Sequence, residues 1–258
     1  GVENVLIGGR VGDALTDADY NVAIGKGALT GDTKGSKSVA VGYQTLVNQN
    51  FTTSTDTFNT AVGFEAGNDI TTGVGNTLVG GLAGDALTDA DFNVAVGKNA
   101  LISDTLGSFN TAVGINALET QNFTTATNAY NTAIGALAGG AITTGTQNTL
   151  IGGAAGDAIN TGANNTAVGK SALSAVTTAS SRSVAIGRNA LGTQNFTTAT
   201  NAENVAVGYY AGTSVSTGIA NTLIGSYAGD SITTGIDDVA LGYKAAEDMT
   251  IGRFNIAI

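Results

Sequence analysis

Residues Asn59–Gly63 read Asn-Thr-Ala-Val-Gly, and close variants of this five-residue motif recur along the whole chain. The glycines that end the motif are usually 17 residues apart. One interval in four is 21 residues instead, and one other interval is a single residue longer than 17. These glycines are Gly8, Gly25, Gly42, Gly63, Gly80, Gly97, Gly114, Gly135, Gly152, Gly169, Gly187, Gly208, Gly225 and Gly242. A unit this short cannot bury an apolar face alone, so stacked copies must bury it together.

A longer period groups four of these units into one super-repeat. Gly12–Leu29 reads GDALTDADYNVAIGKGAL, and Gly84–Leu101 reads GDALTDADFNVAVGKNAL. The motif is a β-rich apolar run followed by glycine, without helical spacing, so it predicts a short strand that ends in a turn. The sequence therefore predicts an all-β fold, a parallel β-solenoid of about 15 coils, with 17-residue coils and one 21-residue coil in every four.

We expect one continuous array over residues 1–258. Its super-repeats cover approximately residues 8–79, 80–151 and 152–224, with a partial copy at 225–258.

The composition fits a narrow core and excludes several functions. The chain has 38 Gly, no Pro, Cys, His or Trp, and only 6% aromatic residues. The net charge of −10 disfavours binding to nucleic acid and to anionic membrane surfaces. There is no run of 18 apolar residues, so we expect no membrane insertion. The absence of Cys and His removes disulfides, thiolate chemistry and every His-dependent base or metal site, and we expect no cofactor.

The five motif positions suggest which side chains face inward. The fourth position is always Val, Ile or Leu, and we expect it to point into the coil. The second position is Val or Thr in the full copies, which suggests a half-buried place. The third position is Ala, or Leu at four places, and alternation along a strand would then turn it outward. The leucines are Leu6, Leu78, Leu150 and Leu223. Both faces of the strand are apolar, so we expect a partner chain to cover an outer Ala/Leu stripe.

The first motif position is Asn except at Ser38, Ser183 and Asp238. Stacked Asn side chains can form a hydrogen-bonded ladder, and the alternative is a simple turn residue before the strand. The invariant glycine at the fifth position suggests a turn with positive φ. A phosphate-binding glycine loop is disfavoured because no helix and no Gly-Lys-(Ser/Thr) pattern follow it.

The long coils carry an insert that reads QNFTTST or QNFTTAT. Its phenylalanines could contact a receptor or another fibre protein, or they could fill the space that the longer coil opens. Its asparagines each begin an Asn-Phe-Thr sequon, so they are candidate glycan attachment sites. The candidate contact residues are Phe51, Phe123 and Phe196, and the candidate glycan residues are Asn50, Asn122 and Asn195.

Acidic residues recur with the super-repeat, which raises two chemical alternatives. Asp13, Asp17 and Asp19 return in the next super-repeat as aspartates, but the third copy keeps only Asp157. A carboxylate pair could hydrolyse glycosides, yet such an enzyme needs acids at one unique place, and here they lie in repeats. Calcium binding is the second alternative, but the spacing matches no calcium loop. We therefore expect solvated acidic turns, no metal site and no enzyme activity.

The repeats resemble the head repeats of trimeric autotransporter adhesins, on phrases such as Ser183–Ala190, which reads SVAIGRNA, and Asn21–Gly25. This resemblance implies a left-handed parallel β-roll with three chains to a head and binding to host surfaces. The coils here are longer, and the four-coil super-repeat is similar to the NTAVG-type arrays in tail-fibre proteins of tailed phages, notably marine cyanophages. Both resemblances imply adhesion by a trimeric rod, and neither implies a catalytic residue.

The sequence thus favours a structural role in a homo-oligomer, which we expect to be a homotrimer. We expect it to be extracellular, in a phage tail fibre or a cell-surface filament, and to support adhesion to a host-surface glycan or receptor. An ice-binding solenoid would need a regular outer array of Thr. The second motif position is Thr in only half of the full copies and in no regular order, so that alternative is disfavoured.

Overall fold

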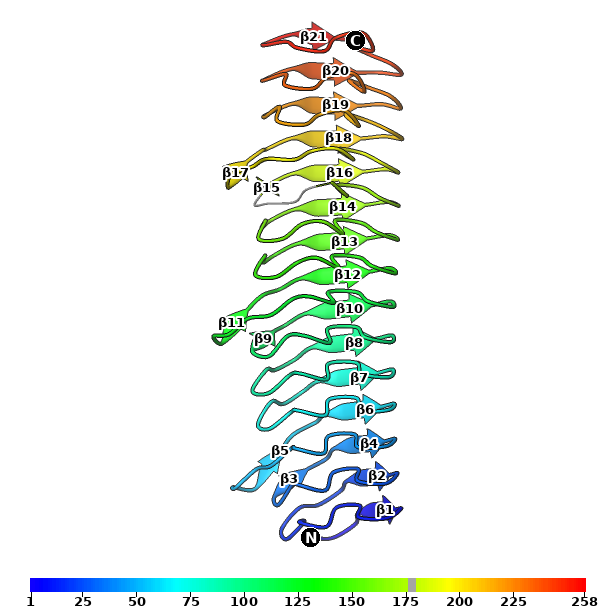
Figure 1. The fold of residues 1–258 in the computed structure, drawn as a ribbon, viewed down its shortest axis with the longest axis vertical. Coiled ribbons are helices and arrows are strands. Elements are labelled where there is room, and N and C mark those ends of the chain that lie inside the picture. Colours follow the sequence, from blue (N-terminus) through cyan, green and yellow to red (C-terminus); the bar gives the residue numbers. More distant parts are fainter. Residues whose placement is uncertain (176–179) are drawn as a thin grey trace. The chain divides into compact units, whose positions relative to one another are not determined.

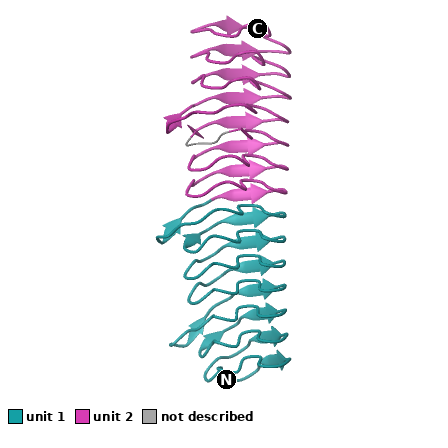
Figure 2. Cartoon of the chain, viewed as in Figure 1, with its two compact units in different colours: residues 1–130 teal, residues 131–258 magenta. Residues whose placement is uncertain are grey.

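The structure is a computed structural model of the 258-residue chain, and it describes residues 1–175 and 180–258. The chain divides into two compact units, residues 1–130 and residues 131–258 (Figure 2). Every regular element in the described residues is a β-strand. No helix in that part of the chain has the length and apolarity needed to cross a membrane.

Unit 1 is a parallel β-solenoid whose main sheet takes one three-residue strand from each turn (Figure 1). Adjacent strands pair in parallel and in register, so Val22 lies beside Val5 on one side and Val39 on the other. The strands of this sheet, in order, are β1 (Val5–Ile7), β2 (Val22–Ile24), β4 (Val39–Val41), β6 (Thr60–Val62), β7 (Thr77–Val79), β8 (Val94–Val96) and β10 (Thr111–Val113).

Unit 2 has the same architecture, with strands of successive turns again paired in parallel. Thr149 lies between Thr132 and Thr166 in neighbouring strands. The strands of its main sheet are β12 (Thr132–Ile134), β13 (Thr149–Ile151), β14 (Thr166–Val168), β16 (Val184–Ile186), β18 (Val205–Val207), β19 (Thr222–Ile224), β20 (Val239–Leu241) and β21 (Ile256–Ala257). The predicted all-β parallel solenoid is confirmed in both units.

Each long turn adds a second, smaller strand pair outside the main sheet. The insert brings its last residues back beside the preceding turn, where two residues of each turn pair in parallel (Figure 1). These pairs are β3 (Gly35–Ser36) with β5 (Thr55–Asp56), β9 (Gly107–Ser108) with β11 (Thr127–Asn128), and β15 (Ser180–Ser181) with β17 (Thr200–Asn201).

The Asn residues of the motif form a buried ladder inside the solenoid. The Oδ1 of Asn59 accepts the backbone N–H of Asn76 at 2.9 Å, one turn later. The Nδ2 of Asn76 donates to the carbonyl of Ala90 at 2.8 Å, on the other side of its own turn. At the exceptions, Ser38 and Asp238 still donate their N–H to the preceding Asn. The ladder prediction is confirmed, and it satisfies backbone groups that would otherwise be buried without partners.

The ladder also explains why one prediction about the motif is wrong. The third position faces inward: Ala23, Ala95 and Leu78 are fully buried, whereas the second and fourth positions are half-buried or exposed. Because Asn is fixed inside the coil at position one, alternation along the strand turns position three inward and positions two and four outward. The outer stripe is therefore Val/Thr and Val/Ile/Leu, not Ala/Leu.

A turn with leucine at the third motif position has glycine six residues later. Where the third position is Leu78, the residue six places later is Gly84; where it is Ala95, that residue is Leu101. A Cβ on Gly84 would lie 2.7 Å from Leu78 Cδ2, and a Cβ on Gly67 in the preceding turn would lie 2.7 Å from Leu78 Cδ1. The core therefore keeps its volume nearly constant, as close-packed interiors require.

The motif glycines have φ between 124° and 145°, which confirms the predicted positive-φ turn. Space gives a second reason for glycine. A Cβ on Gly25 would lie only 2.2 Å from the carbonyl oxygen of Gly42 in the next turn. The column of glycines thus lets successive turns approach closely at the end of each strand.

Candidate functional site

The outer face of the main sheet carries two columns of side chains in each unit, one of Val, Ile and Leu and one of Val and Thr. In unit 2, Ile134, Ile151, Ile186 and Ile224 each leave 37–39% of their surface exposed, and Leu241 leaves 47%. In unit 1, Val79 is 37% exposed, and the second-position Val and Thr residues are half-buried throughout β2 to β10. No charged residue occupies the second or fourth position of any motif copy. The face therefore presents aliphatic and hydroxyl-bearing side chains without charge at these two positions.

Unit 1 has an exposed aromatic column at the residue that immediately precedes the motif Asn. The rings of Phe92 and Phe109 stack with centroids 5.2 Å apart, and Phe109 stacks on Tyr130 at the same distance. Tyr20 and Phe58 occupy the equivalent place in earlier turns and are also exposed. We did not predict this column from the sequence. The available signal was the aromatic residue that precedes the motif Asn in five turns of residues 1–130.

Unit 2 has a cluster of four tyrosines just after its strands. Tyr210 and Tyr227 stack with centroids 5.7 Å apart, and Tyr209 contacts both. Tyr243 meets Tyr227 edge-on at 6.5 Å, and the Arg188 guanidinium lies 5.9 Å from the centre of the Tyr209 ring. These rings rest mainly on one another, which suits stabilisation of the exposed turns.

The predicted contact residues of the insert lie mostly inside the widened turn. Phe51, Phe123 and Phe196 are only 6–7% exposed, so they offer little surface to a partner, and the gap-filling alternative describes their positions.

The sequon residues lie beside these phenylalanines, nearer to solvent. Asn50 and Asn122 are exposed, and Asn195 is half-buried. The Oδ1 atoms of Asn50 and Asn122 accept hydrogen bonds from Thr33 and Thr105 of the preceding turns, both at 3.1 Å. Their glycosylation stays a prediction.

A buried carboxylate anchors the start of the first two inserts. Asp32 accepts hydrogen bonds from Gln49 Nε2 at 2.6 Å, from the N–H of Phe51 at 3.1 Å and from the N–H of Gly35 at 3.0 Å. Asp104 has the same set of donors one super-repeat later. Burial raises the pKa of Asp104, and the hydrogen bonds from Phe123, Gln121 and Gly107 oppose that shift.

The third insert replaces this carboxylate with a hydroxyl. Gln194 Nε2 donates to Ser180 Oγ at 2.6 Å and to Ser183 Oγ at 2.9 Å. Its Oε1 accepts from Asn204 Nδ2 at 2.8 Å, as Gln49 Oε1 accepts from Asn59. A neutral acceptor therefore fills the place of a buried charge.

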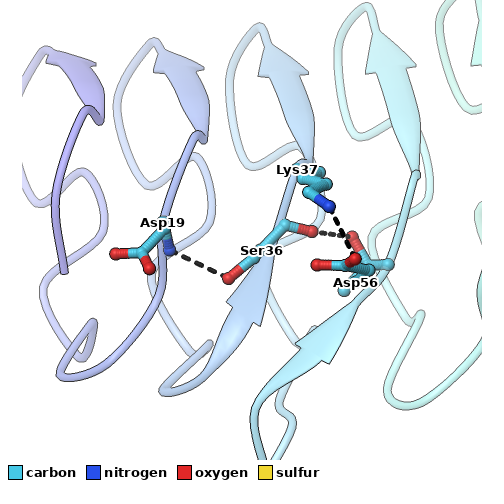
Figure 3. A network of polar contacts seen from close by, with 5 residues as sticks. Asp19, Ser36, Lys37 and Asp56 are labelled. Carbon is cyan, nitrogen blue, oxygen red and sulfur yellow. Dashed lines mark hydrogen bonds and ion pairs between the residues drawn. The ribbon is translucent and has the colours of Figure 1, made fainter.

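Charged side chains at the edge of the first insert link successive turns (Figure 3). Lys37 Nζ contacts Asp56 Oδ2 at 2.6 Å, and Ser36 Oγ accepts the N–H of Asp19 at 2.9 Å. Asp19 itself accepts the N–H of Val2 at 2.6 Å. These acidic residues thus bind the backbone and cations of neighbouring turns.

One of the recurring aspartates has a perturbed pKa, and two others hold neighbouring turns. Burial raises the pKa of Asp85 to about 6, and the nearby charges of Asp69 and Glu65 add to the effect. Asp89 accepts a hydrogen bond from Thr72 at 2.7 Å, and Asp91 accepts the N–H of Val74 at 2.8 Å. Within residues 1–175 and 180–258, no three His, Cys, Asp or Glu side chains converge as a metal site.

No protein-family model, curated protein or solved structure matches this chain.

Proposed function

We propose that the chain is a structural shaft segment of an extracellular fibre, and that it has no catalytic role. The single observation that carries this proposal is the outer face of the main sheet, which repeats an aliphatic residue and a Val or Thr once per turn in both units and has no charge at these positions. A single chain would leave this face in water, and large exposed apolar patches mark interaction surfaces.

The proposed partners are identical chains. A second copy has the same spacing of strands, so each of its turns can meet one turn of its neighbour along the whole face. A closed cyclic assembly shields the outer face of every chain without leaving an open edge. We propose three copies around one axis, because the fibre and adhesin repeats that this sequence resembles are trimeric.

The proposed biological role is to space and present a binding tip for adhesion to a host surface. The arrays are similar to those of phage tail fibres, which favours a virion; the SVAIG-type motif leaves the head of a bacterial surface adhesin as the second candidate. The genes beside this one would separate them, because tail and capsid genes support the first and an outer-membrane anchor supports the second.

The oligomeric state tests the structural proposal directly. In sedimentation equilibrium or light scattering, we expect the mass of three chains. Replacing both Ile151→Lys and Ile186→Lys places charges on the outer face of β13 and β16, and burying them without partners is costly. We expect this double variant to have the mass of one chain.

A matched control keeps the added charge but moves it away from the sheet. Thr53→Lys and Thr125→Lys together add the same two charges at exposed residues of two inserts and should leave the mass unchanged. Far-UV circular dichroism should show β-structure in every variant. A wild-type chain that is monomeric at all concentrations would refute the assembly.

A further inference from the structure

A small hollow lies on the surface of unit 1, beside the ends of β1, β2 and β4. Its volume is about 170 Å³, and it is lined by Arg10, Lys26, Thr30, Tyr43, Gln44 and Val47. Arg10, Lys26 and Tyr43 each follow the motif glycine closely in three successive turns. The stacking of turns therefore brings two cations and one aromatic ring to the same place.

The charge of the hollow is opposite to that of the chain. The chain has 10 Lys and Arg against 20 Asp and Glu, yet two of its cations line this one hollow. Arg10 Nε lies 3.5 Å from Asp13 Oδ2, but both side chains are more than half exposed, so this ion pair is weak and exchangeable. Lys26 has no ion pair in the described part of the chain, and its Nζ lies 5.9 Å from the centre of the Tyr43 ring.

The aromatic ring is held in place from outside the hollow. Tyr43 stacks on Phe64 with centroids 5.3 Å apart and planes 10° apart, and 40% of its surface is exposed. A ring fixed in this way is a rigid platform with low conformational entropy to lose on binding. Thr30 Oγ1 donates to the carbonyl of Arg10 at 2.6 Å, which leaves the hydroxyl oxygen able to accept another hydrogen bond.

We propose that this hollow binds one acidic sugar residue of a surface glycan. The sugar carboxylate would pair with Arg10 and Lys26, and the apolar face of the sugar ring would rest on Tyr43. Thr30 and Gln44 would bind sugar hydroxyls. The hollow is small beside the roughly 300–1,000 Å³ pockets that enclose whole ligands, so it suits a single residue of a longer glycan. This inference deepens the proposed role in adhesion.

The next super-repeat supplies a control within the same unit. Lys98 occupies the place of Lys26 there, but Leu82 replaces Arg10 and Ile115 replaces Tyr43. The second cation and the ring are therefore both missing. Lys98 therefore tests whether one exposed cation on this surface is sufficient to bind an acidic sugar.

The experiment measures binding of trigalacturonate to the full chain by titration calorimetry, with maltotriose as the neutral probe. We expect trigalacturonate to bind and maltotriose to bind at least tenfold more weakly. Lys26→Ala and Tyr43→Ala should each weaken trigalacturonate binding at least tenfold. Tyr43→Phe should stay within threefold of wild type, because the ring remains, and Lys98→Ala should stay within twofold.

Several outcomes would overturn the inference. They are no heat of binding at about 10 mM trigalacturonate, equal binding of maltotriose, equal loss in Lys98→Ala, or full competition by inorganic sulfate at equal concentration. The mass of each sample is measured in parallel. A chain that binds the probe as a monomer would refute only the assembly, and a trimer that does not bind would refute only this site.

Discussion

At the residue scale, several positions in each turn adopt a left-handed backbone conformation although many of them are not glycine. The residue before the motif Asn is an example: φ is 59° at Tyr20, 51° at Phe58 and 56° at Phe92. Such residues cost of order 1 kcal/mol or more, and the penalty is largest for β-branched side chains. Val, Ile and Thr are absent from this position in every turn. Local strain therefore limits which residues the exposed edge can carry.

Asp85 gives a prediction about pH at the same scale. Its pKa is raised to about 6 in the folded chain, from 3.8. A raised folded pKa favours the folded state at pH below 3.8, and this stability is lost as pH rises through about 6. Asp85→Asn should therefore stabilise the chain at pH 7.5 and have little effect at pH 4. Because Asp85 is partly exposed, solvent screening reduces the expected gain to about 1 kcal/mol.

Thermal unfolding at pH 4 and pH 7.5 measures this effect. Asp89→Asn removes the same charge from an exposed residue four places away and serves as the control. An equal stabilisation by Asp85→Asn at both pH values would contradict the assigned cause.

At the element scale, the inserts differ in how a buried glutamine is held. Gln49 and Gln194 have matching partners, except that Gln49 donates to the Asp32 carboxylate and Gln194 to the Ser180 hydroxyl. Each insert therefore starts from a buried polar network in an otherwise apolar interior. Such networks are stable only when every member has a partner.

Replacing each glutamine by methionine compares the two networks. Both variants remove a donor to one serine hydroxyl and the acceptor of one Asn Nδ2. They differ in the remaining partner: Gln49→Met leaves the buried Asp32 carboxylate without its side-chain donor, whereas Gln194→Met leaves the Ser180 hydroxyl without one. A hydrogen bond to a charged group contributes about 1.5–3 kcal/mol and a neutral one about 0.5–1.5 kcal/mol. We expect Gln49→Met to lower the free energy of unfolding by at least about 1 kcal/mol more than Gln194→Met, measured by urea denaturation. Equal losses in the free energy of unfolding would mean that a carboxylate left without its side-chain donor costs no more than a hydroxyl left without one.

The sequence predicts some features of the fold and the candidate site and not others. The recurring glycines predicted the solenoid and the positive-φ turn, because backbone geometry restricts those positions to one residue type. The inward position was assigned wrongly, because apolar side chains on both faces gave no polarity to decide between them. Asp32 stands where most turns have Leu, Ile or Val, so its partner could not be inferred without coordinates. The hollow was not predicted, because the residues that line it come from three separate turns.

At the scale of the whole molecule, most turns are equivalent, but a turn with an inward leucine can be removed only together with the turn before it. Each turn contacts its neighbours through the same ladder and the same parallel pairing, which makes stability approximately a sum over turns. The Leu78 side chain, however, needs Gly67 in the turn before it and Gly84 in its own turn. A turn with an inward Leu and the turn before it therefore form a pair that must be kept or lost together.

Deleting residues 60–93 from unit 1 tests this rule, because it removes two whole turns and joins Asn59 to Val94. The junction restores the motif Asn-Val-Ala-Val-Gly, and Gly67 and Leu78 leave together. We expect β-structure per residue to be retained and cooperative thermal unfolding within about 10 °C of the parent. Deleting residues 60–85 removes less chain but one and a half turns, which leaves a half-turn with no pairing partner. This variant should lose cooperative unfolding and expose apolar surface to a hydrophobic dye. If both deletions unfold alike, the repeat phase does not control the fold.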